Sequence, residues 1–290
     1  MSLPPPVQPL TTFAAEVEGR PVRCLRQGQG PALVLIHGVF ANLEDFVHAP
    51  AGQTGLVEAL AKRFEVLAYD RPGAGFSPRA GCRGWTPFDY AHHLHRLLAQ
   101  LGLRNPVVVG HSYGATVALA YALEFPQATA AVAALSPVAC DMKSLPKIPL
   151  PGVVLPVLGD LMVWTVVPLY VRLWGVQAAG IAFAPEAPPL RHLKRSVRLA
   201  GRPSNFHAVQ RDLKLLPAAL TNMMSRYHEL HLPVLVGTGE KDPVCRPDTQ
   251  ARPLQQRLAD AKLVIWPGWG HGVPVLHPTE TAEALFQFLR

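Results

Sequence analysis

The sequence predicts an α/β fold built on a doubly wound, mostly parallel sheet. Three observations support this prediction: short apolar runs alternate with helical patterns, the alternation stops for about eighty residues and then resumes, and one apolar run ends abruptly in a serine-centred glycine turn. Strands and helices that alternate through right-handed crossovers build such a sheet. With 290 residues, of which 49% are hydrophobic, the chain is long enough to bury one large core.

The first half of the chain contains an opening hairpin and two further strands before the serine turn. The hairpin is expected because Gly19 and Pro21 separate two runs of β-forming residues. Thr86 and Pro87 begin a helix, with the threonine as its cap and the proline at its first position. The elements expected in this half are hairpin strands at 13–17 and 22–26, strands at 32–36 and 64–69, and helices at 55–63 and 86–101.

The second half of the chain interrupts this alternation with an insertion. Residues 139–222 are rich in proline and apolar residues, and we expect them to form a helical cap inserted into a core that comprises 1–138 and 223–290. The core elements expected here are strands at 106–109, 130–135, 233–237 and 262–266, a helix near 247–259 and a final helix at 278–289.

The serine turn is the strongest functional signal in the chain. Residues 107–109 are a buried β-branched run, 110–114 read Gly-His-Ser-Tyr-Gly, and a small-residue helix pattern follows. A strand-to-helix turn this tight forces Ser112 into a strained conformation with its side chain at the top of the sheet. It also requires Gly110 and Gly114, because a Cβ at either position would collide with a neighbouring element. We therefore expect Ser112 to be a nucleophile.

A serine nucleophile needs a base and a group that orients the base. His271 lies just after the strand that ends at Trp266, and Asp242 lies just after the strand at 233–237. Catalytic groups in open α/β sheets gather at the carboxyl ends of strands, so Ser112, Asp242 and His271 are expected to converge there. The alternatives that stay open are His277 as the base, and Glu240 or Asp141 as the acid.

Two backbone amides are expected to form an oxyanion hole. One belongs to Tyr113, at the start of the helix after the turn, and the other to Val39, in the loop after the strand at 32–36. His37, in the same loop, is expected to brace the turn rather than to react. The residues expected to contact the substrate are Phe40, His111, Trp164 and Val273, of which His111 is also expected to pack or bond locally at the turn.

Taken together and in this order, the motifs resemble the α/β-hydrolase superfamily, in the branch that carries a helical cap. The matching segments span about residues 13–290 and include His37-Gly38, Asp70-Arg71-Pro72-Gly73-x-Gly75-x-Ser77, Gly110-His111-Ser112-Tyr113-Gly114, Gly239-Glu240-Lys241-Asp242 and Gly270-His271. The resemblance implies an eight-stranded sheet, a catalytic triad, and neither a metal nor an organic cofactor.

The same resemblance limits the classes of reaction that the chain is expected to catalyse. Haloalkane dehalogenases and epoxide hydrolases carry aspartate where this chain has Ser112, and carbon–carbon bond hydrolases tend to place tryptophan where this chain has Gly272. We expect a serine hydrolase acting on a small to medium, largely apolar ester or lactone. Carbon–carbon hydrolysis, cofactor-free perhydrolysis and, in another functional class, a non-catalytic receptor for a small apolar ligand remain as alternatives.

Positive charge is concentrated in the expected cap. Between residues 139 and 222 ten Lys or Arg face four acids, so this segment carries six of the seven net positive charges. No stacking aromatics interleave with these charges, so we do not expect a nucleic-acid partner. Five cations recur at helical spacing and predict a solvated helix face, with weak contact to an anionic surface as the alternative: Arg191, Lys194, Arg195, Arg198 and Arg202.

Other features bear on location and assembly. The apolar segment 153–171 is interrupted by Pro156, Asp160 and Pro168, so we expect a buried or interfacial segment rather than a membrane span. The first residues do not resemble a secretion signal, which favours a cytoplasmic location. The four cysteines have no disulfide or zinc spacing and are expected to be separate reduced thiols. The protein is expected to be a monomer or a homodimer.

Overall fold

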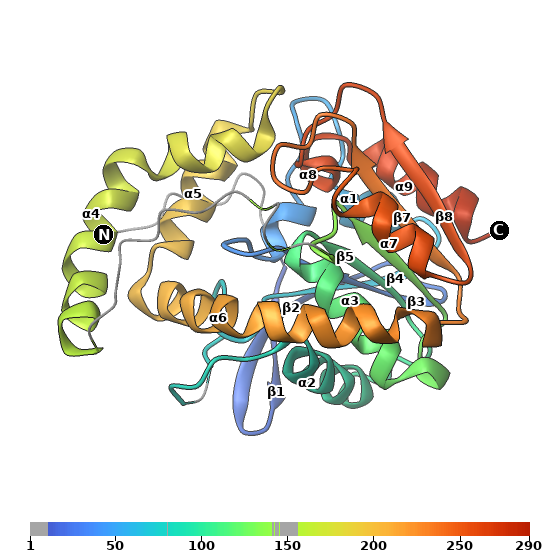
Figure 1. Ribbon diagram of the computed structural model, residues 1–290, viewed down its shortest axis with the longest axis horizontal. Helices are drawn as coiled ribbons and strands as arrows, with labels where there is room; N and C mark the ends of the chain where they lie inside the picture. The colour runs from blue at the N-terminus through green and yellow to red at the C-terminus, as the bar shows by residue number, and fades with distance from the viewer. Residues whose placement is uncertain (1–10, 80, 141, 143–144, 146–155) are drawn as a thin grey trace.

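An eight-stranded sheet runs through the centre of the protein (Figure 1). The structure is a computed structural model, and it describes residues 11–79, 81–140, 142, 145 and 156–290. The strand order is β1-β2-β4-β3-β5-β6-β7-β8, which confirms the predicted doubly wound topology. The strands are β1 (Phe13–Val17), β2 (Arg20–Gln27), β3 (Ala32–Ile36), β4 (Glu65–Tyr69), β5 (Val107–His111), β6 (Ala131–Leu135), β7 (Val234–Gly239) and β8 (Ala261–Trp266).

Strand β2 runs opposite to the other seven described strands of the sheet. It pairs antiparallel with β1 and β4, whereas β4, β3, β5, β6, β7 and β8 pair in parallel. Every residue of β3, β5 and β6 is buried, which agrees with their continuous apolar sequences, because parallel strands are covered on both faces. The carboxyl ends of these parallel strands therefore share one edge of the sheet.

Helices cover both faces of the sheet. Side chains of β3 alternate between two apolar clusters: Val34 packs with the face covered by α2, α3 and α7, and Leu35 with the face covered by α1 and α9. Thr86 and Pro87 begin α2 as predicted, and Asp89 completes a capping box with Thr86. The core helices are α1 (Leu56–Leu60), α2 (Pro87–Gln100), α3 (Tyr113–Glu124), α7 (Ala251–Arg257), α8 (Val273–Leu276) and α9 (Pro278–Phe288), of which α1 and α7 are shorter than expected.

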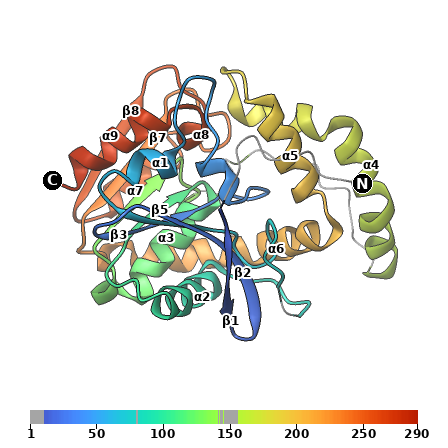
Figure 2. The same ribbon diagram turned by 180° about the vertical axis from the view of Figure 1, so that it is seen from behind.

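Among the described residues between β6 and β7, three α-helices extend to one side of the sheet, as Figure 1 and the reverse view in Figure 2 show. They are α4 (Pro156–Gly180), α5 (Leu190–Ala200) and α6 (Pro203–Arg226), with a short 3₁₀ turn, η4 (Ile181–Phe183), after α4. Phe206, near the start of α6, packs with cap residues, whereas Leu220 and Met223 near its end join the core. Helix α6 therefore connects the cap to the core.

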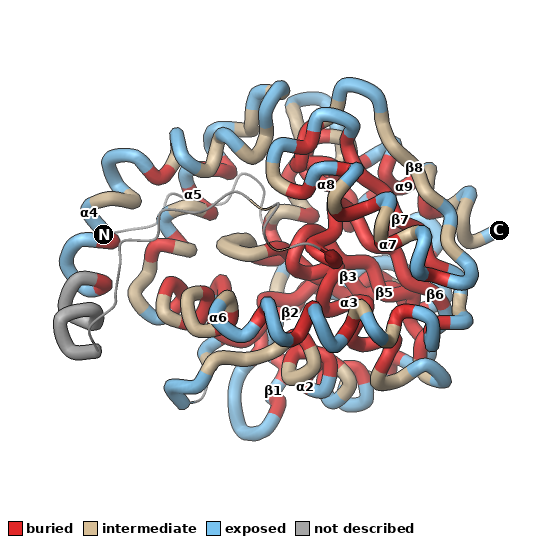
Figure 3. The backbone as a smooth tube through the Cα atoms, in the orientation of Figure 1, coloured by how far each residue is buried: buried red, intermediate tan, exposed pale blue. Residues whose placement is uncertain are grey.

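The structure corrects three expectations about the inserted segment. Pro168 does not interrupt the apolar stretch, because it lies inside α4, a continuous helix of 25 residues. The described part of α4 is mostly exposed (Figure 3), so of the two expected states, buried or interfacial, the buried one is wrong. On α5, Arg195 does not belong to the solvated face: it is buried and forms an ion pair with Glu44 of the 3₁₀ turn η1 (Leu43–Phe46).

Candidate active site

Ser112 occupies a strained turn between β5 and α3. Its backbone angles are φ 56° and ψ −120°, and its amide donates to the carbonyl oxygen of Leu135 at 2.8 Å. A positive φ is unusual for a residue with a side chain and is retained only where the surrounding structure enforces it. A Cβ on Gly110 would collide with Gly114, so the glycine spacing is needed for this turn, as the sequence predicts. Ser112 is nearly buried, at the carboxyl edge of the sheet.

Asp242 and His271 meet on the loops that follow β7 and β8. The Asp242 Oδ2 atom lies 2.8 Å from Nδ1 of His271, and its other oxygen accepts the amides of Val244 at 2.8 Å and Cys245 at 2.7 Å. Burial raises the pKa of Asp242, but His271 and the two amides outweigh it, so the net pKa lies below its usual range. Asp242 is thus held as a carboxylate that orients the imidazole.

The alternative acids and base have other partners. Glu240 accepts the amide of Gly268 at 3.1 Å. His277 is 2.6 Å from Glu186 and its ring stacks on Trp269 at 3.6 Å between centroids. Asp141 lies outside the described residues. The geometry therefore pairs His271 with Asp242, among the groups that the sequence offered.

Cys245 lies between the serine and the acid, and sequence reasoning did not single it out. Its thiol is fully buried beside the side chain of Ser112, while its amide donates to Asp242 at 2.7 Å. Burial raises the pKa of this thiol well above its usual value, so it stays protonated. Between the described side chains of Ser112 and His271 there is no direct hydrogen bond. The position of Cys245, three residues after the acid, was the available signal.

His111, next to the serine, holds the loop that carries His271. Its Nε2–H donates to the carbonyl oxygen of His271 at 2.9 Å, and the two rings are 4.9 Å apart. Burial, and next the proximity of His271, lower the pKa of His111 to about 4. A neutral ring at this position does not repel a positive charge on His271. His111 therefore has the local bonding role that the sequence suggested.

The loop after β3 contacts the serine turn directly. A Cβ placed on Gly38 would lie 3.2 Å from Cβ of Ser112, closer than ordinary van der Waals contact, so glycine allows this approach without a shift of the serine turn. The amide of Arg71 donates to His37 Nε2 at 3.0 Å, which leaves His37 Nδ1–H to donate to Gly38, and the Arg71 guanidinium bonds the Gly38 carbonyl at 2.9 Å. His37 thus braces the loop, as expected. Val39 follows Gly38 immediately.

The structure brings some of the expected substrate residues to this region and not others. Phe40 packs with Phe206 of α6 and with Val163 and Val167 of α4, at the junction of cap and core. Val273 is fully buried at the start of α8, two residues after His271. Trp164 is 66% exposed on α4, and no described contact joins it to Ser112 or His271. Trp164 was expected to contact the substrate because apolar cap residues were assumed to turn inward.

A segment of the cap clamps the His271 loop. The His271 amide donates to the carbonyl oxygen of Ala182 at 3.3 Å, and the Gly270 amide donates to Glu186 Oε2 at 3.1 Å. The other oxygen of Glu186 bonds His277 at 2.6 Å. One cap carboxylate thus ties both ends of the loop. Glu186 was missed because its sequence neighbours are alanines and prolines that carry no motif.

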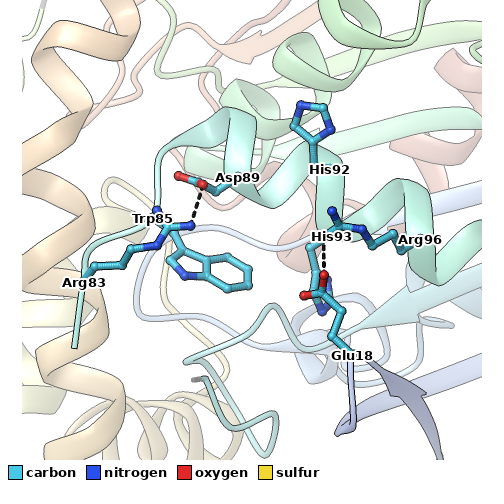
Figure 4. A pocket seen from close by; sticks show the side chains of 7 residues that line it. All are labelled: Glu18, Arg83, Trp85, Asp89, His92, His93 and Arg96. Atoms are coloured by element: carbon cyan, nitrogen blue, oxygen red, sulfur yellow. Dashed lines mark hydrogen bonds and ion pairs between the residues drawn. The ribbon is translucent and has the colours of Figure 1, made fainter. Parts of the chain in front are cut away.

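A polar surface pocket lies elsewhere, between α2 and the β1–β2 hairpin (Figure 4). Its volume is 410 Å³ and its lining includes Trp85 and His93 but none of the expected site residues. Its two arginines are already paired, Arg83 with Asp89 at 2.8 Å and Arg96 with Glu18 at 2.6 Å. These ion pairs leave no uncompensated cation in the pocket for an anionic ligand.

Comparisons with known proteins agree with this architecture. A protein of Synechocystis sp., whose assignment as a non-heme chloroperoxidase is provisional, is 24% identical over 270 residues, 91% of this chain and 92% of that protein. An uncharacterized protein of Mycobacterium tuberculosis is 38% identical over 102 residues, 34% of this chain and 27% of that protein. The chain spans only about a quarter of that relative's length.

Solved structures show the same fold. The enol-lactonase from Burkholderia xenovorans LB400 superposes with a TM-score of 0.72 at 20% identity, covering 96% of this chain and 99% of that one. A family model covers most of the sequence, residues 33–284, and its description is alpha/beta hydrolase family. With the strand order and the serine turn, this match places the chain in the alpha/beta hydrolase family.

Proposed function

We propose that the protein hydrolyses a small to medium, largely apolar carboxylic ester or lactone through an acyl-enzyme on Ser112. The observation that carries the proposal is the 2.8 Å contact between Asp242 and His271 beside the strained serine turn. A base held in one tautomer next to a serine hydroxyl is what serine acyl transfer requires. The family match and an enol-lactonase among the structural neighbours support this choice of reaction.

The proposed reaction has two halves. Rotation of the Ser112 side chain turns its oxygen from Cys245 toward His271, whose Nε2 takes the hydroxyl proton as the oxygen bonds to the substrate carbonyl carbon. The carbon–oxygen bond to the alcohol then breaks, and His271 returns the proton to the leaving oxygen. Water, deprotonated by His271, attacks the acyl-enzyme and releases the acid and the free serine.

The oxyanion that forms in each half needs donors already in place. Tyr113 is the first residue of α3, so its amide N–H has no partner within the helix. Val39 follows the glycine that touches Ser112. We assign these two amides to the oxyanion hole. Removing one such donor costs roughly 2.7–4 kcal/mol of transition-state stabilisation in related chemistry.

The preference for an apolar substrate follows from the cluster at the cap–core junction. Phe40 is next to the proposed oxyanion loop and packs with Val163, Val167 and Phe206. An acyl or alcohol group that enters beside Val39 meets these side chains. Apolar side chains around a few polar groups are typical of small-molecule sites.

Perhydrolysis is a second candidate, favoured by the Synechocystis relative. Hydrogen peroxide attacking the same acyl-enzyme in place of water would release a peracid and the free serine, and the peracid would then oxidise a halide. This chemistry uses the same three side chains and needs no metal. Bromide oxidation in the presence of an ester and peroxide would reveal it.

Labelling and kinetics test the proposal together. A fluorescent fluorophosphonate should modify the wild type and the control Ser204→Ala, which changes an exposed serine of α6, but not Ser112→Ala. On p-nitrophenyl esters of increasing acyl length, Ser112→Ala should lower kcat/KM by several powers of ten. Undiminished turnover by this variant would refute the acyl-enzyme. Intact labelling with no turnover of any ester or lactone would instead favour a ligand receptor.

A further inference from the structure

Helix α4 presents large apolar side chains to solvent on the outer side of the cap. Trp164, Leu169, Leu173 and Trp174 are 66, 56, 48 and 55% exposed. The stretch Val163–Phe183 is long and apolar enough to cross a membrane by length and composition, with a mean hydropathy of 1.4, yet only 11% of it is buried in the protein. Figure 3 shows this side of the cap as mostly exposed. Soluble proteins rarely leave a continuous apolar surface of this kind without a partner.

The charges around this surface have one sign. Arg172 is the only charged residue between 161 and 185. The neighbouring helix α5 exposes Arg191, Lys194 and Arg198, and among the described residues none of these four cations forms an ion pair. Helix α5 touches α4 where Val197 approaches Gly175. In the sequence of α5, Val197 lies between two of these cations, Lys194 and Arg198. Positive charge therefore borders the apolar surface.

We propose that the exposed face of α4 docks on the surface of an anionic phospholipid bilayer. Leu169 and Leu173 would enter the boundary between headgroups and acyl chains, the tryptophans would lie at headgroup depth, and the cations of α5 would meet the lipid phosphates. This combination of an apolar helix face with flanking basic residues is the pattern of helices that lie in the membrane interface.

The helix lies along the surface rather than through the bilayer because the protein holds both of its ends. Val163 and Val167 are buried against Phe206 of α6 near one end. At the other end, Ala182 receives the amide of His271, a core residue. Crossing the bilayer would require α4 to release these contacts and to bury Arg172 in the hydrocarbon. The docking surface is therefore interfacial.

A lipid surface fits better than a second copy of the chain. In a two-fold symmetric dimer the same patch contacts itself, so the cations of α5 would approach their own counterparts. No acidic residue between 161 and 185 is available to neutralise them. Anionic headgroups supply the opposite charge. Charge complementarity thus selects the bilayer.

Vesicle flotation of the full-length protein tests the proposal without any substrate. The wild type should bind vesicles of phosphatidylcholine with phosphatidylglycerol more strongly than vesicles of phosphatidylcholine alone, and high salt should weaken binding. Leu169→Glu should lower the partition coefficient by about 10-fold or more. The matched control is Leu215→Glu, at an exposed leucine of α6, and it should bind like the wild type. A blue shift of tryptophan fluorescence should disappear in the variant Trp164→Phe/Trp174→Phe.

Failure to bind either vesicle, or equal binding by Leu169→Glu, would overturn the proposal. Light scattering that finds a dimer, which Leu169→Glu converts to monomers, would assign the face to a second copy instead. Ser112→Ala should bind vesicles like the wild type, because docking does not involve the nucleophile. Leu169→Glu should still hydrolyse short soluble esters. Loss of docking and loss of the proposed activity are therefore distinguishable.

Discussion

Arg195 of the cap and Glu44 of the core form a two-pronged ion pair that is almost closed to solvent. The Arg195 Nε atom is 2.6 Å from Oε2 of Glu44 and its Nη2 atom is 3.1 Å from Oε1, while Arg23 contacts the same carboxylate at 3.0 Å. Burial alone would raise the pKa of Glu44. The contacts with His48 and the two arginines lower this pKa by a larger amount, so the net pKa lies below its usual value and the group remains ionised. The pair joins α5 to the turn after β3.

Removing Arg195 should destabilise the protein, because Glu44 would stay buried with one arginine fewer. We expect Arg195→Met to lower the free energy of unfolding by about 3 kcal/mol, a typical cost of breaking a buried pair. Arg198→Met, three residues away on the exposed face of α5, should change it by no more than about 0.5 kcal/mol. Urea titrations followed by circular dichroism measure both. Equal effects of the two substitutions would mean that the buried pair has no special role.

His93 should make stability fall at acidic pH. Burial, and next Arg96, lower its pKa from 6.5 to about 4, so the folded state keeps it neutral where the unfolded chain binds a proton. Stability from this group is therefore present above pH 6.5 and is lost as the pH falls toward 4. Between pH 7.5 and pH 5 this histidine should cost the wild type roughly 2 kcal/mol of its free energy of unfolding, a loss that His93→Phe should not show.

Urea unfolding at the two pH values measures this difference. The substitution His231→Phe changes an exposed histidine and provides the matched control, since it removes no buried ring. A wild-type and His93→Phe difference that stays constant between pH 5 and pH 7.5 would contradict the prediction.

Glu186 should act as a positioning residue for His271. Because it bonds both Gly270 and His277, Glu186→Ala should let the loop shift and lower kcat for a short ester by about 10- to 100-fold, with a smaller effect on KM. Glu186→Gln retains an acceptor oxygen and should recover much of the loss. The control Glu283→Ala, at an exposed acid of α9, should leave kcat unchanged. An equal loss in the Gln and Ala variants would argue against positioning by hydrogen bonding.

One thiol per chain should react rapidly in the folded protein. Cys82 is exposed, whereas Cys24, Cys140 and Cys245 are buried. Burial raises the pKa of Cys24 to about 12 and that of Cys245 well above its usual value, so neither supplies a thiolate. Titration with a chromogenic disulfide at pH 8 should give one fast thiol, absent in Cys82→Ser, and three more in denaturant. Two or more fast thiols in the native protein would contradict the burial of these side chains.

Much of the fold could be predicted because the signals for it are local. An apolar run of five residues identifies β3, a shorter β-branched run at 107–109 identifies β5, and a turn confined to residues 110–114 identifies the position of Ser112. The pairing of Asp242 with His271 follows from chain order and from the shared carboxyl edge of the sheet. For the strands and the serine turn the physical cause lies within a few residues of the pattern, whereas for the pairing it lies in the parallel order of the strands.

The remaining features depend on contacts between distant segments. The spacing of the α5 cations could not show that Arg195 alone turns toward Glu44, 151 residues earlier. The apolar sequence of α4 is equally compatible with burial and with exposure, and only the packing of α5 and α6 shows that most of it is exposed. Glu186 and Cys245 likewise gain their roles from loops that meet in three dimensions.

The insertion between β6 and β7 leaves the pairing of these strands intact, with Val132 directly opposite Val234. The sheet therefore tolerates whatever polypeptide joins the two strands, since the entropy of closing a loop rises only slowly with its length. By this argument a different polypeptide between β6 and β7 would give the same edge of the sheet a new entrance, and new surroundings, without refolding the scaffold beneath.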